Sequence, residues 1–567
     1  MDKVCEKINN LFNFESKKRK LLYCFCITFL LGILGYAFSF FHPSTTLDAC
    51  LFDYSTDETH LYSIGRFVQN WYNNVVATYR VEFLGGIIWL TLISLCLYYT
   101  DSLFDLNNKF FILVLSACIL FSGLSIRSIN YFPFANPLFV LSLLLGIIAV
   151  YCFRKCARGR YVSFVLFTVL AIGLYQNAVC ISFGLLCITT IIDLLSGKNS
   201  KLIFKEIILE ILCIAISLAI YFIIYNLILL LFRINKDSGA YNSSERIQFY
   251  GIKRTVKLTI KTYILFFRNL VLCSNYQDDG VFKQFSSTHE IFVLIGFIIS
   301  LYYTFIYLIR IFKIKKIDKV RIILVLGVLA ILPFAFACIC VVTNGLGVPN
   351  LYLQDYLAIS IPFVLVKVLN DSSNKEKYEK TDLFISLGIG AFISLIVIAL
   401  YFIKYRGNQA IKTFIYQITL SVIIIFVILL KKKTSFIKSL KLCLLSLLSI
   451  GIIFNGISYA NVQSTKNYVI SQKRLSMSGR LIQIMEDENV DNSSKIYFYG
   501  KTDKFDEPIP EFLVSYLNFF FDKNYSYVSE DFVLTADRIN DIDGLSCFPS
   551  RNCIKIIDGV LVVKLSE

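Results

Sequence analysis

Long apolar runs dominate the pattern of hydrophobic and polar positions along the chain. They are roughly long enough to cross a hydrocarbon core of ~30 Å, although the fifth and sixth are short. The runs predict membrane-spanning helices at 21–41, 83–100, 109–126, 132–153, 161–175, 177–195, 204–232, 290–312, 320–342, 351–369, 382–403, 411–430 and 438–458. We therefore expect an all-α polytopic membrane protein over residues 1–458, with about 13 transmembrane helices.

Basic clusters fall in alternate loops between these runs. They lie at 17–20, 154–160, 198–205, 310–321, 375–380 and 431–441. Because short cytoplasmic loops collect Lys and Arg, this side is predicted to be cytoplasmic. The N-terminus is then cytoplasmic and the C-terminus extracytoplasmic.

Three segments predicted on the outer side are long: loops 42–82 and 233–290, and the tail 459–567. The second loop is basic, against the charge rule, but long loops obey that rule weakly. Within it, 255–272 alternates basic and apolar residues at helical spacing. This stretch predicts an amphipathic helix on the outer membrane surface.

The tail predicts a small extracytoplasmic α/β domain. Residues 466–485 and 511–521 have helical patterns, and 495–500 alternates like a strand. Residues 553–564 predict two strands joined by a hairpin turn at Asp558-Gly559.

Composition agrees with the membrane class. Only 17% of residues are charged, against about a quarter in soluble domains. The net charge of +16 lies mostly beside apolar runs, so we expect no nucleic-acid partner. The 17 cysteines lie mostly inside apolar runs, without zinc spacing. In the tail, Cys547 and Cys553 fit a disulfide or two free thiols equally well.

Candidate chemistry concentrates in the first outer loop. Four acids and one arginine gather there: Asp48, Asp53, Asp57, Glu58 and Arg66. A solvated acidic loop would explain the four acids taken alone. If 57–67 is helical, however, Glu58, Tyr62 and Arg66 share one face, next to Asp57. Carboxylates on an interfacial helix can hold a general base beside a lipid-linked substrate.

Two stretches resemble the Gtr-type O-antigen glucosyltransferase family. Ser44…Asp48…Asp57…Gly65-Arg66-Phe67-Val68-Gln69 is similar to its first outer loop, and Gly173-Leu174-Tyr175-Gln176-Asn177 is similar to its Tyr-Gln element. The pair Asp57-Glu58 also resembles the Asp-Glu pair of the wider GT-C glycosyltransferases. The sequence departs from the family at Asn70-Trp71-Tyr72, where Pro-Tyr is common, and at Arg80-Val81, where Arg-Gly is usual. These departures leave the sugar and the acceptor open.

The resemblance implies an inverting membrane glycosyltransferase with a GT-C-like fold, in the cytoplasmic (inner) membrane of a bacterium. Its donor would be a sugar on a polyprenyl phosphate, with glucose as the favoured sugar. Its acceptor would be a cell-surface polysaccharide or lipid-linked glycan such as O-antigen, reached at the outer face. Membrane lipids, a small flippase and a donor-synthesising glycosyltransferase are the other implied partners. We expect no cofactor and no metal.

The resemblance also implies roles for particular residues. We assign Asp57 as the base, with Asp48 as its alternate and Glu58 orienting the acceptor or Asp57. The substrate-binding candidates are Arg66, Tyr62, Tyr175, Gln176, Arg246, Lys253 and Arg254. Arg66 would hold the acids in place or contact phosphate. Lys253 and Arg254 fit lipid headgroups equally well, and Tyr175 and Gln176 fit packing at a membrane boundary.

The alternatives are a glycan flippase or transporter, and a polysaccharide polymerase or ligase. A transporter needs polar residues buried in mid-span. The spans show few, and Asp193 and Glu206 lie near span ends. A polymerase or ligase of similar topology shares the outer-loop chemistry and stays open.

Overall fold

The computed structural model describes residues 16–42, 59–76, 82–121, 125, 129, 136–196, 198–234, 251–260, 263, 319–338, 435–501, 510–528 and 535–566. The predicted spans 290–312, 351–369, 382–403 and 411–430 lie outside these residues, so the count of thirteen stays a prediction. The chain divides into two compact units near residues 35 and 460, with the C-terminal residues 461–567 in the second.

The first unit is helical. Among the described residues, four helices are long and apolar enough to cross a membrane: α2 (Lys17–Phe41), α6 (Glu82–Phe104), α9 (Asn136–Lys155) and α12 (Ser200–Phe232). The other apolar helices described between residues 105 and 340 are α7 (Lys109–Leu120), α10 (Arg160–Leu174), α11 (Ala178–Leu195) and α15 (Lys319–Ala337). These helices fit the predicted class of membrane protein.

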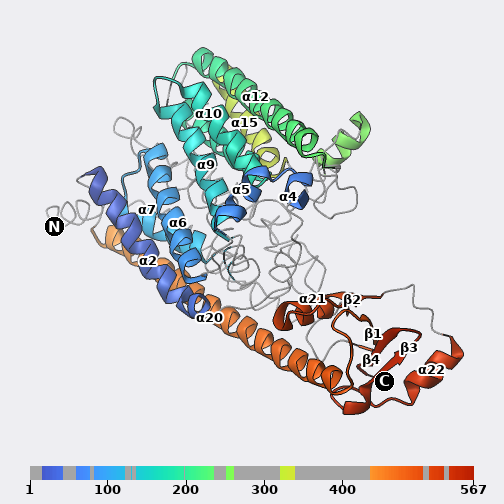
Figure 1. Cartoon of the computed structure of the whole chain (residues 1–567). Helices are drawn as coiled ribbons and strands as arrows, with labels where there is room; N and C mark the ends of the chain where they lie inside the picture. The colour runs from blue at the N-terminus through green and yellow to red at the C-terminus, as the bar shows by residue number, and fades with distance from the viewer. Residues whose placement is uncertain are drawn as a thin grey trace. The chain divides into compact units, whose positions relative to one another are not determined.

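Helix α9 is central to the packing of the first unit. It packs against α6, α10 and α11, while α12 packs along α10, and α15 packs on α11 (Figure 1). Large apolar side chains such as Ile211, Ile223 and Leu230 are exposed on α12. An apolar surface of this extent suits lipid rather than water.

One charged cluster joins the end of α9 to α11 and α12. Arg154 donates hydrogen bonds to Asp193 (3.1 Å), Glu206 (3.2 Å) and Thr190 (2.7 Å), and to Glu210. The Arg154 and Glu210 side chains are largely buried. A buried arginine paired with carboxylates ties three helices together, because none of these charges can be left alone without a large cost.

A second buried ion pair joins α2 to α6. The Lys20 ammonium lies 2.9 Å from the Asp101 carboxylate, which also accepts from the backbone N–H groups of Asn107 and Asn108. Further contacts, Lys155 to Asp105 and Arg321 to the Lys198 carbonyl, connect the same ends of the helices. The structure thus gathers the basic clusters of 17–20, 154–160 and 198–205 at one end of the unit. Their cytoplasmic location stays a prediction.

Helix α20 (Ser435–Asp487) begins the C-terminal part of the chain. It runs without a break through the predicted last span and the predicted tail helix, where two separate helices were expected. The elements that follow are β1 (Lys495–Tyr499), α21 (Pro510–Phe521), β2 (Ser526–Tyr527), α22 (Ala536–Asp543), a 3₁₀ turn (Arg551–Cys553), β3 (Ile554–Ile557) and β4 (Val560–Lys564). Their strand order is β2-β1-β4-β3, with β1 parallel to both neighbours and β3 antiparallel to β4.

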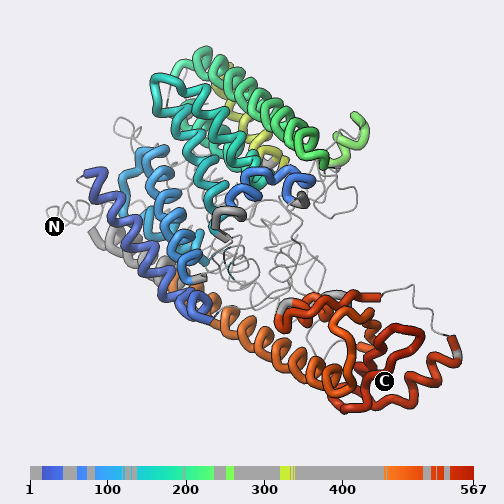
Figure 2. The backbone as a smooth tube through the Cα atoms, in the orientation of Figure 1, coloured from blue at the N-terminus to red at the C-terminus, as the bar shows by residue number. Residues whose placement is uncertain are grey.

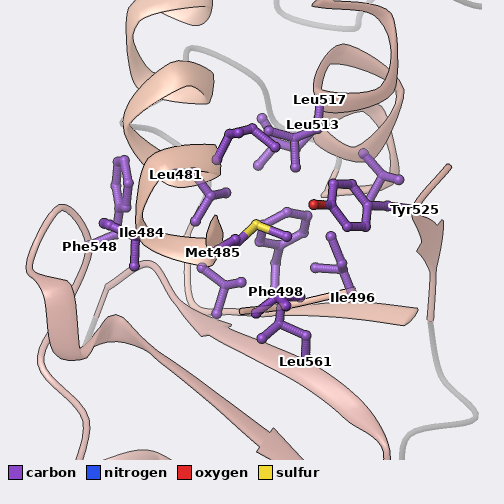
Figure 3. Close-up of a cluster of buried hydrophobic side chains, with 14 of the residues drawn as sticks. Leu481, Ile484, Met485, Ile496, Phe498, Leu513, Leu517, Tyr525, Phe548 and Leu561 are labelled. Atoms are coloured by element: carbon purple, nitrogen blue, oxygen red, sulfur yellow. The ribbon is translucent and has the colours of Figure 1, made fainter. Parts of the chain in front are cut away.

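The alternation of more exposed and buried side chains along β1 shows which face of this sheet is covered. Ile496 and Phe498 point into a core with Leu513 and Leu517 of α21, and Met485 of α20 lies in the same core (Figure 3). Strands β3 and β4 are joined by a two-residue turn in which Asp558 and Gly559 both have positive φ, as a type I′ hairpin requires. No disulfide joins Cys547 and Cys553, and Cys553 is buried.

Replacing Arg154 by Met should lower the free energy of unfolding by about 3–5 kcal/mol, because the buried Glu210 carboxylate then loses its counter-charge. Asp193 keeps an ion pair with Lys198, and Glu206 keeps one with Arg160. The measurement is chemical unfolding of the purified protein in detergent. Asp105→Asn is the control, because it breaks a more exposed pair with Lys155 and should cost no more than about 1 kcal/mol. Equal losses in the two variants would contradict a special role for the Arg154 cluster.

Candidate functional site

The predicted acids fall outside the described residues. Asp48, Asp57 and Glu58 are in this group, as is Arg246. The description of the first outer loop begins with α4 (Thr59–Ser63), directly after the pair Asp57-Glu58. The structure therefore places the substrate-binding candidates other than Arg246, and the carboxylates stay predictions.

A sharp turn at Gly65 ends α4. Gly65 has a φ of +80°, its N–H donates to the Tyr62 carbonyl (3.0 Å), and the Arg66 N–H donates to the Leu61 carbonyl (2.8 Å). These two hydrogen bonds are those of a Schellman motif. A new helix, α5 (Phe67–Val76), starts after the turn (Figure 2).

The expectation of one helix over 57–67 is therefore wrong in its C-terminal half. The left-handed backbone at Gly65 breaks the helical repeat, so Tyr62 and Arg66 do not share a helical face. Tyr62 instead stacks on Phe232 at the end of α12, with ring centroids 5.3 Å apart.

Two tyrosines of α12 hold this turn in place. The Tyr225 hydroxyl donates to the Ser63 carbonyl (2.8 Å), and the Tyr221 hydroxyl donates to the Gly65 carbonyl (3.0 Å). A Cβ atom on Gly65 would lie 2.4 Å from the Tyr221 hydroxyl oxygen. Glycine is therefore required twice, by the backbone angle and by the closeness of α12.

The turn places Arg66 beside the connection between α10 and α11. Its Nε donates to Gln176 Oε1 (3.4 Å), and its guanidinium lies over the Tyr175 ring, 5.1 Å from the centroid. Gln176 in turn donates through Nε2 to the Ile64 carbonyl (2.7 Å). Gln176 thus holds both the cation and the backbone that precedes it.

The charge of Arg66 lacks a counter-ion within the part of the chain that the structure describes. No ion pair joins it to a carboxylate there, and its neighbours are the uncharged Gln176 and Tyr175. Burial lowers the pKa of the Arg66 guanidinium, an effect that Tyr175 and Tyr221 oppose. Arginine nevertheless stays protonated in proteins, because its guanidinium is a very weak acid.

Glycine also allows the Tyr-Gln element to approach α5. A Cβ atom on Gly173 would lie 2.7 Å from Val68 and 2.9 Å from the Phe67 ring. The Tyr175 ring packs edge-on against Phe139, with centroids 5.0 Å apart. Tyr175 and Gln176 therefore contact Arg66, and they also bind to neighbouring elements: Tyr175 packs on Phe139, and Gln176 donates to the Ile64 carbonyl.

The remaining candidates lie on another element. Lys253 and Arg254 are exposed on a short helix over 252–260, whose apolar residues Ile252 and Val256 are also exposed. This helix overlaps the first part of the predicted amphipathic helix 255–272, whose residues after 260, except Tyr263, lie outside the described residues. Its location on the outer membrane surface stays a prediction. The structure leaves open the choice between phosphate and lipid headgroups for the two cations.

Tyr221 and Tyr225 were missed in the sequence. Their signal is available, because two hydroxyls four residues apart on an otherwise aliphatic span lie on one helical face. Asn70 was also missed as a site residue. It is 2% exposed, and its Nδ2 has no hydrogen-bond partner among the described residues.

The arrangement offers binding rather than proton transfer. A guanidinium fixed by an amide and an aromatic face, with no carboxylate beside it in the described chain, is suited to an anion such as phosphate. A base for acid–base chemistry would have to come from other residues, and the acids 48–58 precede this turn directly in sequence.

Comparison with known proteins agrees with the motifs. A family model described as "Glucosyl transferase GtrII" matches residues 37–367, more than half of the chain, and includes Arg66, Gln176 and the tyrosines of α12. Searches of the curated proteins and of the solved structures gave no match. From the extent of the family match, this chain belongs to the GtrII glucosyltransferase family.

Proposed function

We propose that this membrane glycosyltransferase transfers a sugar from a polyprenyl phosphate to a cell-surface polysaccharide or lipid-linked glycan such as O-antigen. Glucose is the favoured sugar. The reaction would take place at the outer face of the cytoplasmic membrane of a bacterium. Family membership supports the glucosyl group and the class of reaction. The donor, the acceptor and the side of the membrane are the proposal.

The observation that carries the proposal is the guanidinium of Arg66. It is held by Gln176 and Tyr175, and no described carboxylate neutralises it. Partial burial of an unpaired cation is costly, so such a group is usually kept for a ligand. A sugar on a polyprenyl phosphate brings a phosphodiester anion, and Arg binds phosphate oxygens through two parallel N–H groups.

The chemistry needs one base and one leaving group. An acceptor hydroxyl oxygen attacks the anomeric carbon, and the bond from that carbon to the phosphate oxygen breaks. The hydroxyl proton passes to the carboxylate of Asp57, and polyprenyl phosphate leaves with the bonding electrons. A single displacement of this kind inverts the anomeric configuration. Arg66 would bind the phosphate charge that grows as the bond breaks.

The residues around Asp57 have supporting roles in this scheme. Asp48 is the alternate base, and Glu58 orients the acceptor or Asp57. Lys253 and Arg254 would attract the donor headgroup from the outer membrane surface. The expectation that transfer needs no divalent cation stays a prediction.

The described charges give less support to a transporter. The buried ion pairs of Arg154 and Lys20 lie near helix ends. Along α12, Glu210 and Tyr225 are separated by about 22 Å at 1.5 Å per residue. Within the described helices, the ion-paired groups thus lie far from the Arg66 turn. A transport path would instead need polar groups that continue through the middle of the membrane.

Deleting the gene should remove one side-chain sugar from the surface polysaccharide and leave its backbone intact. Composition and linkage analysis of the polysaccharide is the measurement. Complementation with the wild-type gene should restore the sugar. A shortened or missing backbone would instead indicate a polymerase, ligase or export protein.

Replacing Arg66 by Ala should lower kcat/KM for the polyprenyl-phosphate donor by about 100-fold or more, as for loss of other groups that stabilise transition-state charge. Arg66→Lys should recover only part of the loss, because an ammonium lacks the two-pronged geometry of guanidinium. The assay is sugar transfer in detergent or proteoliposomes.

Arg158→Ala is the matched control for Arg66, because Arg158 is exposed in a basic cluster far along the chain from the Arg66 turn. It should leave kcat/KM unchanged. Full activity in Arg66→Ala would show that Arg66 does not bind the donor phosphate during transfer.

Asp57→Ala should abolish transfer, with a loss of about 10²–10⁴-fold or more, while insertion and folding persist. Gel filtration in detergent checks the fold. Asp53→Ala is the control, because it removes a neighbouring acid that has no assigned role. If Asp57→Ala is fully active and Asp48→Ala is inactive, the base is Asp48.

A further inference from the structure

The side chain of Asn70 is an anomaly in the site. It is 2% exposed, and among the described residues its Nδ2 has no hydrogen-bond partner. The great majority of buried polar side-chain atoms have a partner in protein or ordered water. An amide nitrogen that is buried without one costs folding free energy that an apolar residue of the same size would avoid.

The position of Asn70 links it to Arg66. Its backbone N–H donates to the Arg66 carbonyl (3.0 Å), the first helical hydrogen bond of α5. Arg66 directly precedes α5 and Asn70 lies in the first turn of that helix, so both residues are held at the start of α5.

The neighbouring residues of α5 are used for packing on other elements. Phe67 stacks on Tyr221, with ring centroids 5.7 Å apart, and Val68 packs at Gly173. These contacts fix the rotation of α5 about its axis. The same contacts hold Asn70 in place in the first turn of α5, directly after the turn that carries Arg66.

We propose that Asn70 is a specificity-determining residue whose amide NH₂ donates a hydrogen bond to a hydroxyl of the sugar being transferred. This inference rests on the proposed function. A neutral amide donor matches a neutral hydroxyl, whereas the phosphate takes the charged guanidinium. The anomeric carbon is bonded directly to a phosphate oxygen. The sugar ring therefore lies next to the group that binds the phosphate, and Asn70 is in the first turn of the helix that directly follows Arg66.

The sugar would then supply the acceptor that the amide lacks. A site built to hydrogen-bond a hydroxyl strongly disfavours an analogue without that hydroxyl, because the buried group of the protein is left unpaired. Asn70 would thus select the donor by one particular hydroxyl.

The test compares polyprenyl-phosphate glucose with its 2-, 3-, 4- and 6-deoxy counterparts as donors for the full-length protein. Wild type should use one of the deoxy donors about 10- to 100-fold less well in kcat/KM than the glucose donor. Asn70→Leu should lower kcat/KM for glucose by a similar factor and leave that deoxy donor unchanged, so the discrimination disappears. Thermal unfolding of Asn70→Leu should occur at or above the wild-type temperature, because the amide nitrogen makes no hydrogen bond to the described residues.

Trp71→Phe is the control, because the neighbouring Trp71 is 67% exposed; it should keep the discrimination. Lower stability of Asn70→Leu with an equal loss for all donors would make Asn70 a structural residue and overturn the inference. Unchanged discrimination in Asn70→Leu would also overturn it and leave the proposed function intact. If wild type transfers sugar from none of these donors, the proposed function itself fails.

Discussion

Two tyrosine hydroxyls on an apolar helix determine where the candidate site can form. In an apolar environment a backbone carbonyl must find a donor within the protein. The turn after α4 exposes the carbonyls of Ser63 and Gly65, and Tyr225 and Tyr221 of α12 satisfy them. The segment from α4 to α5 is thereby joined to a long helix of the same unit.

Everything else in the site follows from this attachment. The turn sets the direction in which Arg66 leaves α4 and in which α5 begins. Gly65 and Gly173 allow the close approach that the tyrosines and α5 require. Gln176 then connects the turn to α10 and α11 by accepting from Arg66 and donating to Ile64. The cation is held by groups that leave its charge available for a ligand.

The two ends of the helical unit differ in the groups that surround their cations. Around Arg154 and Lys20 the cations are paired with carboxylates, and the pairs connect α2, α6, α9, α11 and α12. At the Arg66 turn the described cation has an aromatic ring and an amide instead. Paired charges stabilise contacts between helices at the first end. At the second end, within the described residues, the Arg66 guanidinium has no ion pair and the Asn70 amide nitrogen has no hydrogen-bond partner.

The sequence by itself determined the membrane class and the Tyr-Gln and Gly-Arg motifs. It also determined the approximate positions of the helices α2, α6, α7, α9, α10, α11, α12 and α15. Apolar run length and the clustering of Lys and Arg are local properties, so they can be seen without a fold. The strand at β1 and the Asp558-Gly559 turn are equally local. The match of the GtrII family model agrees with the motif-based resemblance.

The partners of Arg66 were decided only by the tertiary structure. A helical repeat through 57–67 predicts that Arg66 joins Glu58 and Tyr62, but the left-handed angle at Gly65 turns the chain away. Residues 110 and 156 positions distant then complete the turn, namely Gln176 for Arg66 and Tyr221 for Gly65. Sequence periodicity carries no information about such distant pairs, because they depend on how α10, α11 and α12 pack side by side.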